Sequence, residues 1–436
     1  MTNTKLRALG VAALVVLGGC ELDKTNPNAP TQTTILGSRE GVTALAIGAQ
    51  ARFGSGMSAF IYPGGLISDE FGTPIGALQS YKDAEVGALA ATYDAVEVPW
   101  QSHYQTIKTA NDLIENAPKV DLGDQTQSGI LGMSYLLKAA SLGDLIQLYQ
   151  KIIINPEVDS PVFVDRPVAL TYILGLLDTA LVQTRLFPSR SVFDGSIRAK
   201  GFDVTNTALA MQARYQRLAG NWPAALAAAN QVDTSVVSVM PFSDQAINPI
   251  FDLSSRSSYV RPRDTLRVVA EAGDARVAFN LTGATVTGTV RPIRSFAQFS
   301  ATTSSIAFYW PGEVMLIKAE ALANTGQVPA AATLVNYVRT RCGGTSVQPK
   351  ACLPALPAAS LATQAQVIAE IYNQRKFELF ATGLRWEDVR RLSLVSATSP
   401  YAKRCWLLYP NSERNTQPNV PASPVDPPTT LSGCPG

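Results

Sequence analysis

Two adjacent carboxylates come closer to a catalytic pair than any other residues of this chain. Asp69 and Glu70 stand in "FGSGMSAFIYPGGLISDEFGTPIG", a segment rich in Gly and Pro. Glycoside hydrolysis uses two carboxyl groups beside the scissile bond, so sequence alone leaves an acid and base role open. A helix cap or a hydrogen-bonding post within a loop is the simpler role, and we favour it.

Other catalytic constellations are missing from the sequence. His103 is the only histidine, which excludes every site that needs two, and no two cysteines form a CxxC pair. There is no GxSxG nucleophile elbow, no Gly-rich phosphate loop and no zinc motif. The sequence therefore predicts a protein that is not an enzyme and that binds neither a metal nor a cofactor.

The N-terminal residues have the composition of an export signal. Lys5 and Arg7 precede the apolar stretch "ALGVAALVVLGG", which is too short for a transmembrane helix. Small residues followed directly by Cys20 favour a lipoprotein signal over a secretory signal with a chance cysteine. We expect residues 1–19 to be removed, Cys20 to carry lipid chains, and the polar residues 20–34 to form a flexible tether. No other stretch looks apolar enough to span a membrane.

The remaining cysteines agree with export, because an even number in an exported chain indicates disulfides. Cys342, Cys352, Cys405 and Cys434 allow three pairings. We prefer the sequence-local pairing, Cys342–Cys352 and Cys405–Cys434, over the two that cross the chain. The second bridge would hold the Pro-rich C-terminal tail against the body.

Charge makes nucleic acid a poor candidate partner. The chain has a formal net charge of +2. Without Lys5 and Arg7 the 36 basic residues fall to 34, which equals the 34 acidic residues, and no long basic run exists. A hydrophobic content of 46% is ample for a sizeable core.

Helical periodicity dominates the chain. The segment "WQSHYQTIKTANDLIENA" places Tyr104, Ile107 and Ile114 on one stripe, and "SGILGMSYLLKAASLGDLIQLYQKI" is apolar over most of its circumference, which predicts a buried helix or helix pair. Four tryptophans fall inside helical segments and are assigned to the core. These are Trp100, Trp222, Trp310 and Trp386.

Two stretches resemble each other and predict helical hairpins. Aligned on Gly220 and Gly326, both have the pattern A-x6-G-x-x-P-A-A. Gly ends one helix in the left-handed conformation, and Pro starts the next within its first turn. This is the helix-turn-helix unit of tetratricopeptide repeats, although two unrelated hairpins remain an alternative.

Three regions look like insertions into this helical body. Residues 54–99 are rich in Gly and Pro, while 188–206 and 240–305 are rich in polar and β-branched residues. Within the last region, "DTLRVV", "VAFNLTG" and "TVTGTVRPI" are expected to form short strands or a hairpin. A helical body with long irregular loops indicates a binding surface made by the loops.

Several segments together resemble the SusD/RagB family of outer-membrane nutrient-binding lipoproteins. They are the lipobox at Cys20, "WQSHYQTIKTANDLIE", "EVMLIKAEALANTGQVPAAATLVNYVRTRCGG" and "QRKFELFATGLRWEDVRRL". The polar string "YPNSERNTQPNV" at residues 409–420 is similar to the family's closing loop, and we expect it to dock the terminus on the body. The resemblance implies a mainly α, single SusD-like domain over residues 35–436, with tetratricopeptide-like hairpins, long irregular loops and a few short strands.

The fourth of these segments carries charged residues that we interpret as structural. On the helix-Gly-helix turn around Gly383, the spacing of Glu378 to Arg385 and of Asp388 to Arg391 predicts ion pairs that hold the turn shut. Arg375 completes the motif.

The resemblance also implies function, location and partners. Such proteins lie on the cell surface, lipid-anchored to the outer membrane, over a SusC-like TonB-dependent barrel transporter, and deliver oligosaccharides or other nutrients to it. Eight loop residues are candidates for ligand contact, since aromatic faces stack on sugar rings and polar groups bind hydroxyls. They are Tyr62, Asp69, Phe71, Tyr81, Tyr93, Tyr259, Arg261 and Phe296. Few tryptophans remain outside the helices to stack on sugar rings, so peptides or smaller nutrients remain possible ligands. The alternative is a lipid-anchored helical-repeat scaffold that binds another envelope protein without a small ligand.

Overall fold

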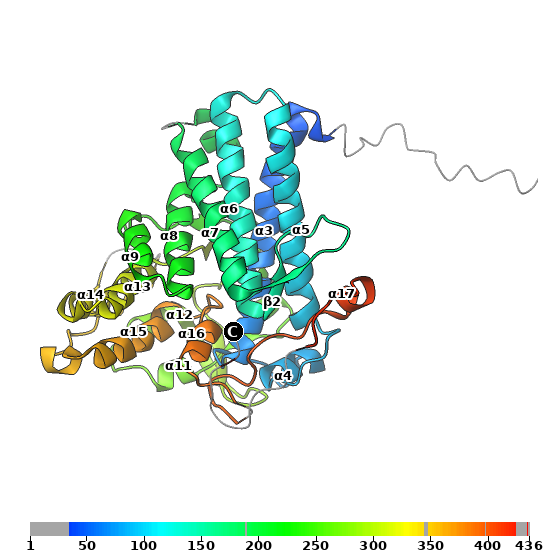
Figure 1. Cartoon of the computed structure of the whole chain (residues 1–436). Coiled ribbons are helices and arrows are strands. Elements are labelled where there is room, and N and C mark those ends of the chain that lie inside the picture. The colour runs from blue at the N-terminus through cyan, green and yellow to red at the C-terminus, as the bar shows by residue number, and fades with distance from the viewer. Residues whose placement is uncertain (1–34, 188–189, 344–347, 397, 424–433, 435–436) are drawn as a thin grey trace, which may run out of the picture.

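Four long helices form the tallest part of the molecule. The computed structural model describes residues 35–187, 190–343, 348–396, 398–423 and 434. The long helices stand side by side and form the upper part of the body in Figure 1. They are α3 (Arg39–Ile67), α5 (Asp94–Asn116), α6 (Asp124–Leu148) and α7 (Arg166–Arg185). The fold is mainly α, as the sequence predicted.

Helix α6 is the central helix of this bundle. By length and composition α6 and α7 could each cross a membrane, which corrects the expectation that no such stretch follows the signal. In the most apolar window of α6, however, 94% of the residues are buried inside the protein. Helix α6 is apolar on most sides because α5, α7 and α3 all pack against it. The predicted buried helix is confirmed.

Helix α3 extends further than the sequence predicted. Residues 54–67 were assigned to an irregular insertion because of their Gly and Pro content, but they continue the helix to Ile67. A Cβ atom on Gly56 would lie 2.5 Å from Ser102 Oγ of α5, and one on Gly54 would lie 2.8 Å from Met240 Cγ. These glycines therefore allow neighbouring segments to approach α3 closely, and burial of the helix outweighs their low helix propensity.

The two helical hairpins predicted from the repeated pattern are present. They are α8 (Val204–Leu218) with α9 (Trp222–Gln231), and α13 (Pro311–Asn324) with α14 (Val328–Thr340). Gly220 and Gly326 follow the first helix of each hairpin with φ of +74° and +81°. A proline lies in the first turn of α9 and of α14. Helix α13 packs on both α9 and α14, so the hairpins meet although their starts, Val204 and Pro311, are 107 positions apart.

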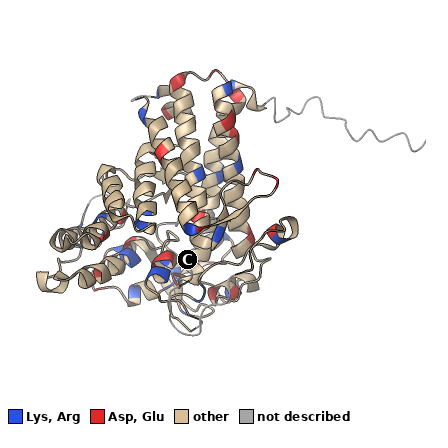
Figure 2. Ribbon diagram, viewed as in Figure 1, with Lys and Arg blue, Asp and Glu red and all other residues tan. Residues whose placement is uncertain are grey.

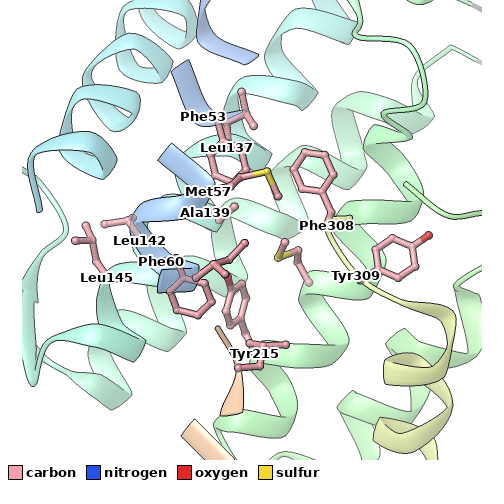
Figure 3. Packing of buried hydrophobic residues seen from close by; sticks show 14 of the residues in the cluster. Phe53, Met57, Phe60, Leu137, Ala139, Leu142, Leu145, Tyr215, Phe308 and Tyr309 are labelled. Carbon is pink, nitrogen blue, oxygen red and sulfur yellow. The ribbon is translucent and has the colours of Figure 1, made fainter. Parts of the chain in front are cut away.

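Two hydrophobic clusters fill the interior. The larger one joins α3, α6 and α8 to the segment before α13, where Phe53 stacks on Phe308 with ring centroids 5.6 Å apart (Figure 3). The smaller one lies between α13, α14 and α15 (Gln364–Glu378) and includes Leu316, Val335 and Ile371. Of the four tryptophans assigned to the core, Trp222 is only half-buried.

Short elements connect the helices. The strands form antiparallel pairs: β1 (Phe71–Gly72) with β5 (Arg261–Pro262), β2 (Lys151–Ile153) with β3 (Phe163–Asp165), β4 (Val239–Met240) with β8 (Ile306–Ala307), and β6 (Leu281–Val286) with β7 (Ile293–Phe296). The helical pieces are α4 (Gln79–Glu85), η1 (Ala117–Lys119), η2 (Phe193–Ile197), α10 (Pro249–Phe251), η3 (Asp252–Arg256), α11 (Thr265–Val268), α12 (Arg276–Asn280), η4 (Ala358–Leu361), α16 (Arg385–Arg391) and α17 (Asn411–Thr416). The expected hairpin is β6–β7, whereas "DTLRVV" forms α11 and not a strand.

Buried ion pairs join the hairpins to α15 and α16, whose ribbons carry charges of both signs (Figure 2). The carboxylate of Asp388 accepts from Arg375 Nε at 2.7 Å and from Arg217 Nη2 at 3.1 Å. Glu378 pairs with Arg341, and Arg391 with Glu320 at 2.9 Å. The predicted pairs Glu378–Arg385 and Asp388–Arg391 are therefore wrong in their partners, because residues distant in sequence supply the counter-charges.

The segment after α16 docks on the bundle. Tyr409 is buried against Trp100, Tyr149 and Phe163, and Trp100 Nε1 donates to Glu413 of α17 at 3.0 Å. Disulfides join Cys342 to Cys352 and Cys405 to Cys434, which is the sequence-local pairing. The signal peptide, Cys20 and the tether lie outside the described residues.

Candidate functional site

A cavity opens where α3 ends, at the same end of the molecule as α11, α15 and α16 (Figure 1). Its volume is about 200 Å³. The cavity is lined by buried side chains inside and by exposed or half-exposed side chains at the rim. The buried ones are Glu70, Arg263, Leu266 and Phe380. The rim includes Asp69, Arg291, Lys376, Arg385, Val269, Pro400 and Tyr401.

Asp69 is held at the edge of this cavity in an unusual backbone conformation. Its φ of +63° lies in the left-handed region, which Asp tolerates better than most residues. Its carboxylate accepts from Arg291 Nη1 at 2.6 Å and pairs with Arg263 Nη2 at 3.1 Å. Burial raises the pKa of Asp69, while the two guanidinium groups oppose that shift. Strained residues that are fixed by several contacts are typical of functional sites.

Glu70 is the buried partner of this pair. Its side chain is 5% exposed, and neither carboxylate oxygen accepts a well-formed hydrogen bond from the described residues. Burial raises the pKa of Glu70 to about 8, against the opposing effect of Arg385 and the Ala381 amide. At neutral pH the group is therefore mostly protonated.

Arg263 brings unpaired donors to the cavity. The side chain is 1% exposed, and its Nη2 atom bridges Asp69 and Glu85, the latter at 2.6 Å. Within the described chain, Nε and Nη1 have no hydrogen-bond partner. A buried donor without an acceptor costs about 1–3 kcal/mol, so an acceptor from a ligand would be stabilised here.

Further cations and one aromatic ring surround the opening. Arg385 and Lys376 line the cavity without an ion pair to any described residue, and Lys376 Nζ lies 4.6 Å from the Phe377 ring centre. Tyr401, which is 43% exposed, presents a ring at the mouth. A cavity that combines hydrogen-bond donors with an exposed aromatic ring is suited to hold a small polar molecule.

The eight residues predicted to touch ligand divide into two groups. Phe71, Phe296, Tyr62 and Tyr81 are at most 6% exposed, which corrects their assignment. They pack on one another as core aromatic pairs: Phe71–Phe296 and Tyr62–Tyr81, with ring centres 5.2 Å and 5.7 Å apart.

The other four keep some exposed surface, but only Asp69 lines the cavity. Tyr93 donates to Asp83 at 2.8 Å, Arg261 donates to Ser295 at 3.1 Å, and Tyr259 packs on Tyr81. Sequence reasoning missed Arg263, Arg291, Lys376 and Tyr401. The neighbouring arginines in "VRPRD" were the available signal for Arg263.

Two other hollows are less suited to a ligand. A groove of about 560 Å³ runs along α5 and α17, where Trp100 and Glu413 already bind each other. A larger space of about 1020 Å³ lies beside the Cys342–Cys352 disulfide, lined in part by Gly343 and Gln348. In the described ranges, no three His, Cys, Asp or Glu side chains gather as metal ligands would.

Comparison with known proteins identifies a family model that matches part of the chain. The family model of the SusD family matches residues 274–422. No curated protein matches the chain by sequence.

Solved structures share the fold over most of the chain. A SusD superfamily protein from Bacteroides thetaiotaomicron superposes with a TM-score of 0.69 at 16% identity, covering 89% of this chain and 100% of that one. One from Bacteroides fragilis has a TM-score of 0.69 at 14% identity, covering 88% and 99%. A SusD-like carbohydrate binding protein from Bacteroides vulgatus has a TM-score of 0.62 at 14% identity, covering 82% and 84%. Together with the family model, these structures support the resemblance carried by the sequence motifs: residues 274–422 match the SusD family, and the chain has the fold of SusD superfamily structures.

Proposed function

We propose that this protein captures a saccharide nutrient at the cell surface and delivers it to a TonB-dependent barrel transporter of the SusC type. The match to the SusD family supports the proposal, and one structural relative is described as a carbohydrate binding protein. The observation that carries it is the cavity beside Asp69, which is lined by Arg263 with its unpaired buried donors and by the exposed ring of Tyr401.

The chemistry of this cavity suits capture better than catalysis. Asp69 is engaged by two guanidinium groups, which fits the hydrogen-bonding post expected for a loop carboxylate. Glu70 is buried and mostly protonated at pH 7, so neither carboxyl group is available as a free base. We therefore propose a binding protein and not a glycosidase.

Anchoring through Cys20 completes the proposal. Residues 35–436 would form one domain, carried on a tether of residues 20–34 that reaches about 50 Å when fully extended. Helix α3 is roughly 43 Å long from its start near the tether to its end at the cavity. Because the two lengths are similar, either end of the body can face the barrel.

Titration calorimetry of the mature chain with a panel of oligosaccharides tests the binding role. We expect at least one saccharide to bind, Tyr401→Ala to weaken it at least tenfold, and Tyr337→Ala, an equally exposed tyrosine on α14, to leave it unchanged. A panel without any binding, together with a stable complex with another envelope protein, would favour the scaffold alternative. Recovery of a barrel transporter with the tagged lipoprotein from detergent extracts tests the delivery role.

A further inference from the structure

The cavity beside Asp69 has a marked excess of positive charge. Four cationic side chains line it, namely Arg263, Arg291, Lys376 and Arg385, against Asp69 and Glu70. Lys403 also lies close enough to influence the charge of Asp69. The chain as a whole is nearly neutral, so this excess is a local feature.

Internal pairing does not remove the excess. Asp69 is shared between Arg263 and Arg291, and Glu85 takes a further bond from Arg263. Within the described residues, neither Arg385 nor Lys376 has an ion-pair partner, and both are partly withdrawn from water. Burial lowers the pKa of Lys376, and nearby guanidinium groups act in the same direction, while Glu370 opposes the shift.

Glu70 does not compensate these cations either. Its carboxyl group has no well-formed hydrogen bond, and its raised pKa keeps it mostly neutral at pH 7. The buried Arg263 still has Nε and Nη1 unpaired. An anionic acceptor suits these donors, because hydrogen bonds between ionised partners are the strong ones.

The mouth and the volume of the cavity restrict which kind of anionic ligand fits. Tyr401 and Val269 are exposed there and offer an apolar face. A volume of about 200 Å³ is below the usual range of ligand pockets, so it holds a single ring rather than a chain segment.

We propose that the cavity takes an acidic sugar residue of an anionic saccharide, with its charged group at Arg263, Arg385 and Lys376 and its ring against Tyr401. This inference rests on the proposed function and names the ligand class for the same site. A carboxylate and a sulfate share the required chemistry, and the planar carboxylate matches a guanidinium group.

Calorimetry with matched ligands tests the inference. Oligogalacturonate, its carboxyl-reduced neutral counterpart and a sulfated oligosaccharide are titrated into the mature chain at two salt concentrations. We expect oligogalacturonate to bind at least tenfold more tightly than the neutral counterpart, and the preference to shrink as salt rises. Tighter binding of the sulfated ligand would assign the anion as sulfate and overturn the carboxylate preference.

Variants locate the preference in this cavity. Arg385→Gln and Lys376→Gln should each reduce the ratio of acidic to neutral affinity at least tenfold, whereas Lys119→Gln in η1 should not change it. Lys376 is only half-buried, so its variant remains informative if Arg385→Gln fails to fold.

The outcomes separate the two proposals. Equal binding of acidic and neutral saccharides overturns this inference and leaves saccharide capture intact. Absence of binding by every saccharide contradicts both. Binding of citrate or an acidic peptide as tight as that of oligogalacturonate overturns the assignment to a sugar.

Discussion

At the scale of single residues, the chain places a carboxyl group where water cannot solvate it. Glu70 follows a strained Asp69 and is buried among Arg263, Arg385 and the Ala381 backbone, with Asp388 acting as a more distant like charge. Such an arrangement is costly, and proteins tolerate it mainly where the group serves a site. Glu70 should therefore be visible in the pH dependence of stability.

We expect Glu70→Gln to be more stable than the wild type at pH 9 and similar to it at pH 4. The folded-state pKa of Glu70, about 8, exceeds the ordinary 4.5, so the folded protein binds more protons between these values. The contribution of Glu70 to the free energy of unfolding is therefore fully present below pH 4.5, and it is lost as the pH rises through 8. Each unit of pKa difference corresponds to about 1.4 kcal/mol.

Thermal unfolding of both proteins across this pH range measures the effect. Glu115→Gln, a change of the same chemistry on the exposed face of α5, provides the control. Parallel stability curves for Glu70→Gln and the wild type would show that Glu70 is ionised in the folded state.

Sequence reasoning at this scale found the carboxylates but not their partners. Asp69 stood out because a charged pair in a Gly- and Pro-rich segment is unusual. Its partners Arg263 and Arg291 lie 194 and 222 positions later, and no local pattern connects them. Aromatic residues in the same segments were assigned to the surface, yet Phe71 and Phe296 pack together because burial of aromatic area outweighs their loop-like surroundings.

At the scale of elements, the turns of the two helical hairpins depend on glycine. Gly326 has φ of +81°, and a Cβ atom there would meet nothing within 4 Å. Only backbone strain therefore opposes a side chain, and Gly326→Ala should lower the free energy of unfolding by about 1 kcal/mol.

Gly175→Ala provides the matched control in denaturant unfolding. It lies within α7, is equally free of neighbours and does not have a positive φ. Alanine should stabilise that position by about 0.5–1 kcal/mol. Equal effects at both glycines would contradict the role assigned to the turn.

The buried ion pairs also act at this scale, since Asp388 links α16 to α15 and α8. Burial acts to raise its pKa, but Arg375 and Arg217 hold the pKa of Asp388 below its ordinary value. Asp388→Asn leaves the buried Arg375 without its counter-charge, so we expect the free energy of unfolding to fall by about 3–5 kcal/mol. Arg217 keeps its ion pair with Glu320.

Chemical denaturation measures this loss, with Asp178→Asn on the exposed face of α7 as the control. A change below about 1 kcal/mol for Asp388→Asn would show that the network is solvated in solution.

Element types were predictable where their signals are local. The Gly and Pro positions predicted both hairpins, and the apolar circumference predicted α6. The ion-pair partners were not predictable, because spacing along one helix cannot reveal that Arg341 and Arg217 approach from other helices. The length of α3 was underestimated because its glycines serve contacts with α5 and not a turn.

At the scale of the whole molecule, the C-terminal segment closes on the body through Tyr409, α17 and a disulfide. Removing the bridge with Cys405→Ala and Cys434→Ala together should destabilise the protein by about 3 kcal/mol in the loop-entropy model, since 29 positions separate the cysteines. Thermal unfolding of the double variant under oxidising conditions measures it. An unchanged melting temperature would show that docking of Tyr409 and α17 suffices.

We expect a saccharide to bind in the cavity beside Asp69. The crystal structure of the mature chain with the saccharide that binds most tightly in calorimetry tests it most directly. We predict a sugar ring against Tyr401, with an oxygen within hydrogen-bond distance of Arg263 Nε or Nη1. Density for the sugar in the groove between α5 and α17, with the cavity beside Asp69 empty, would contradict the account.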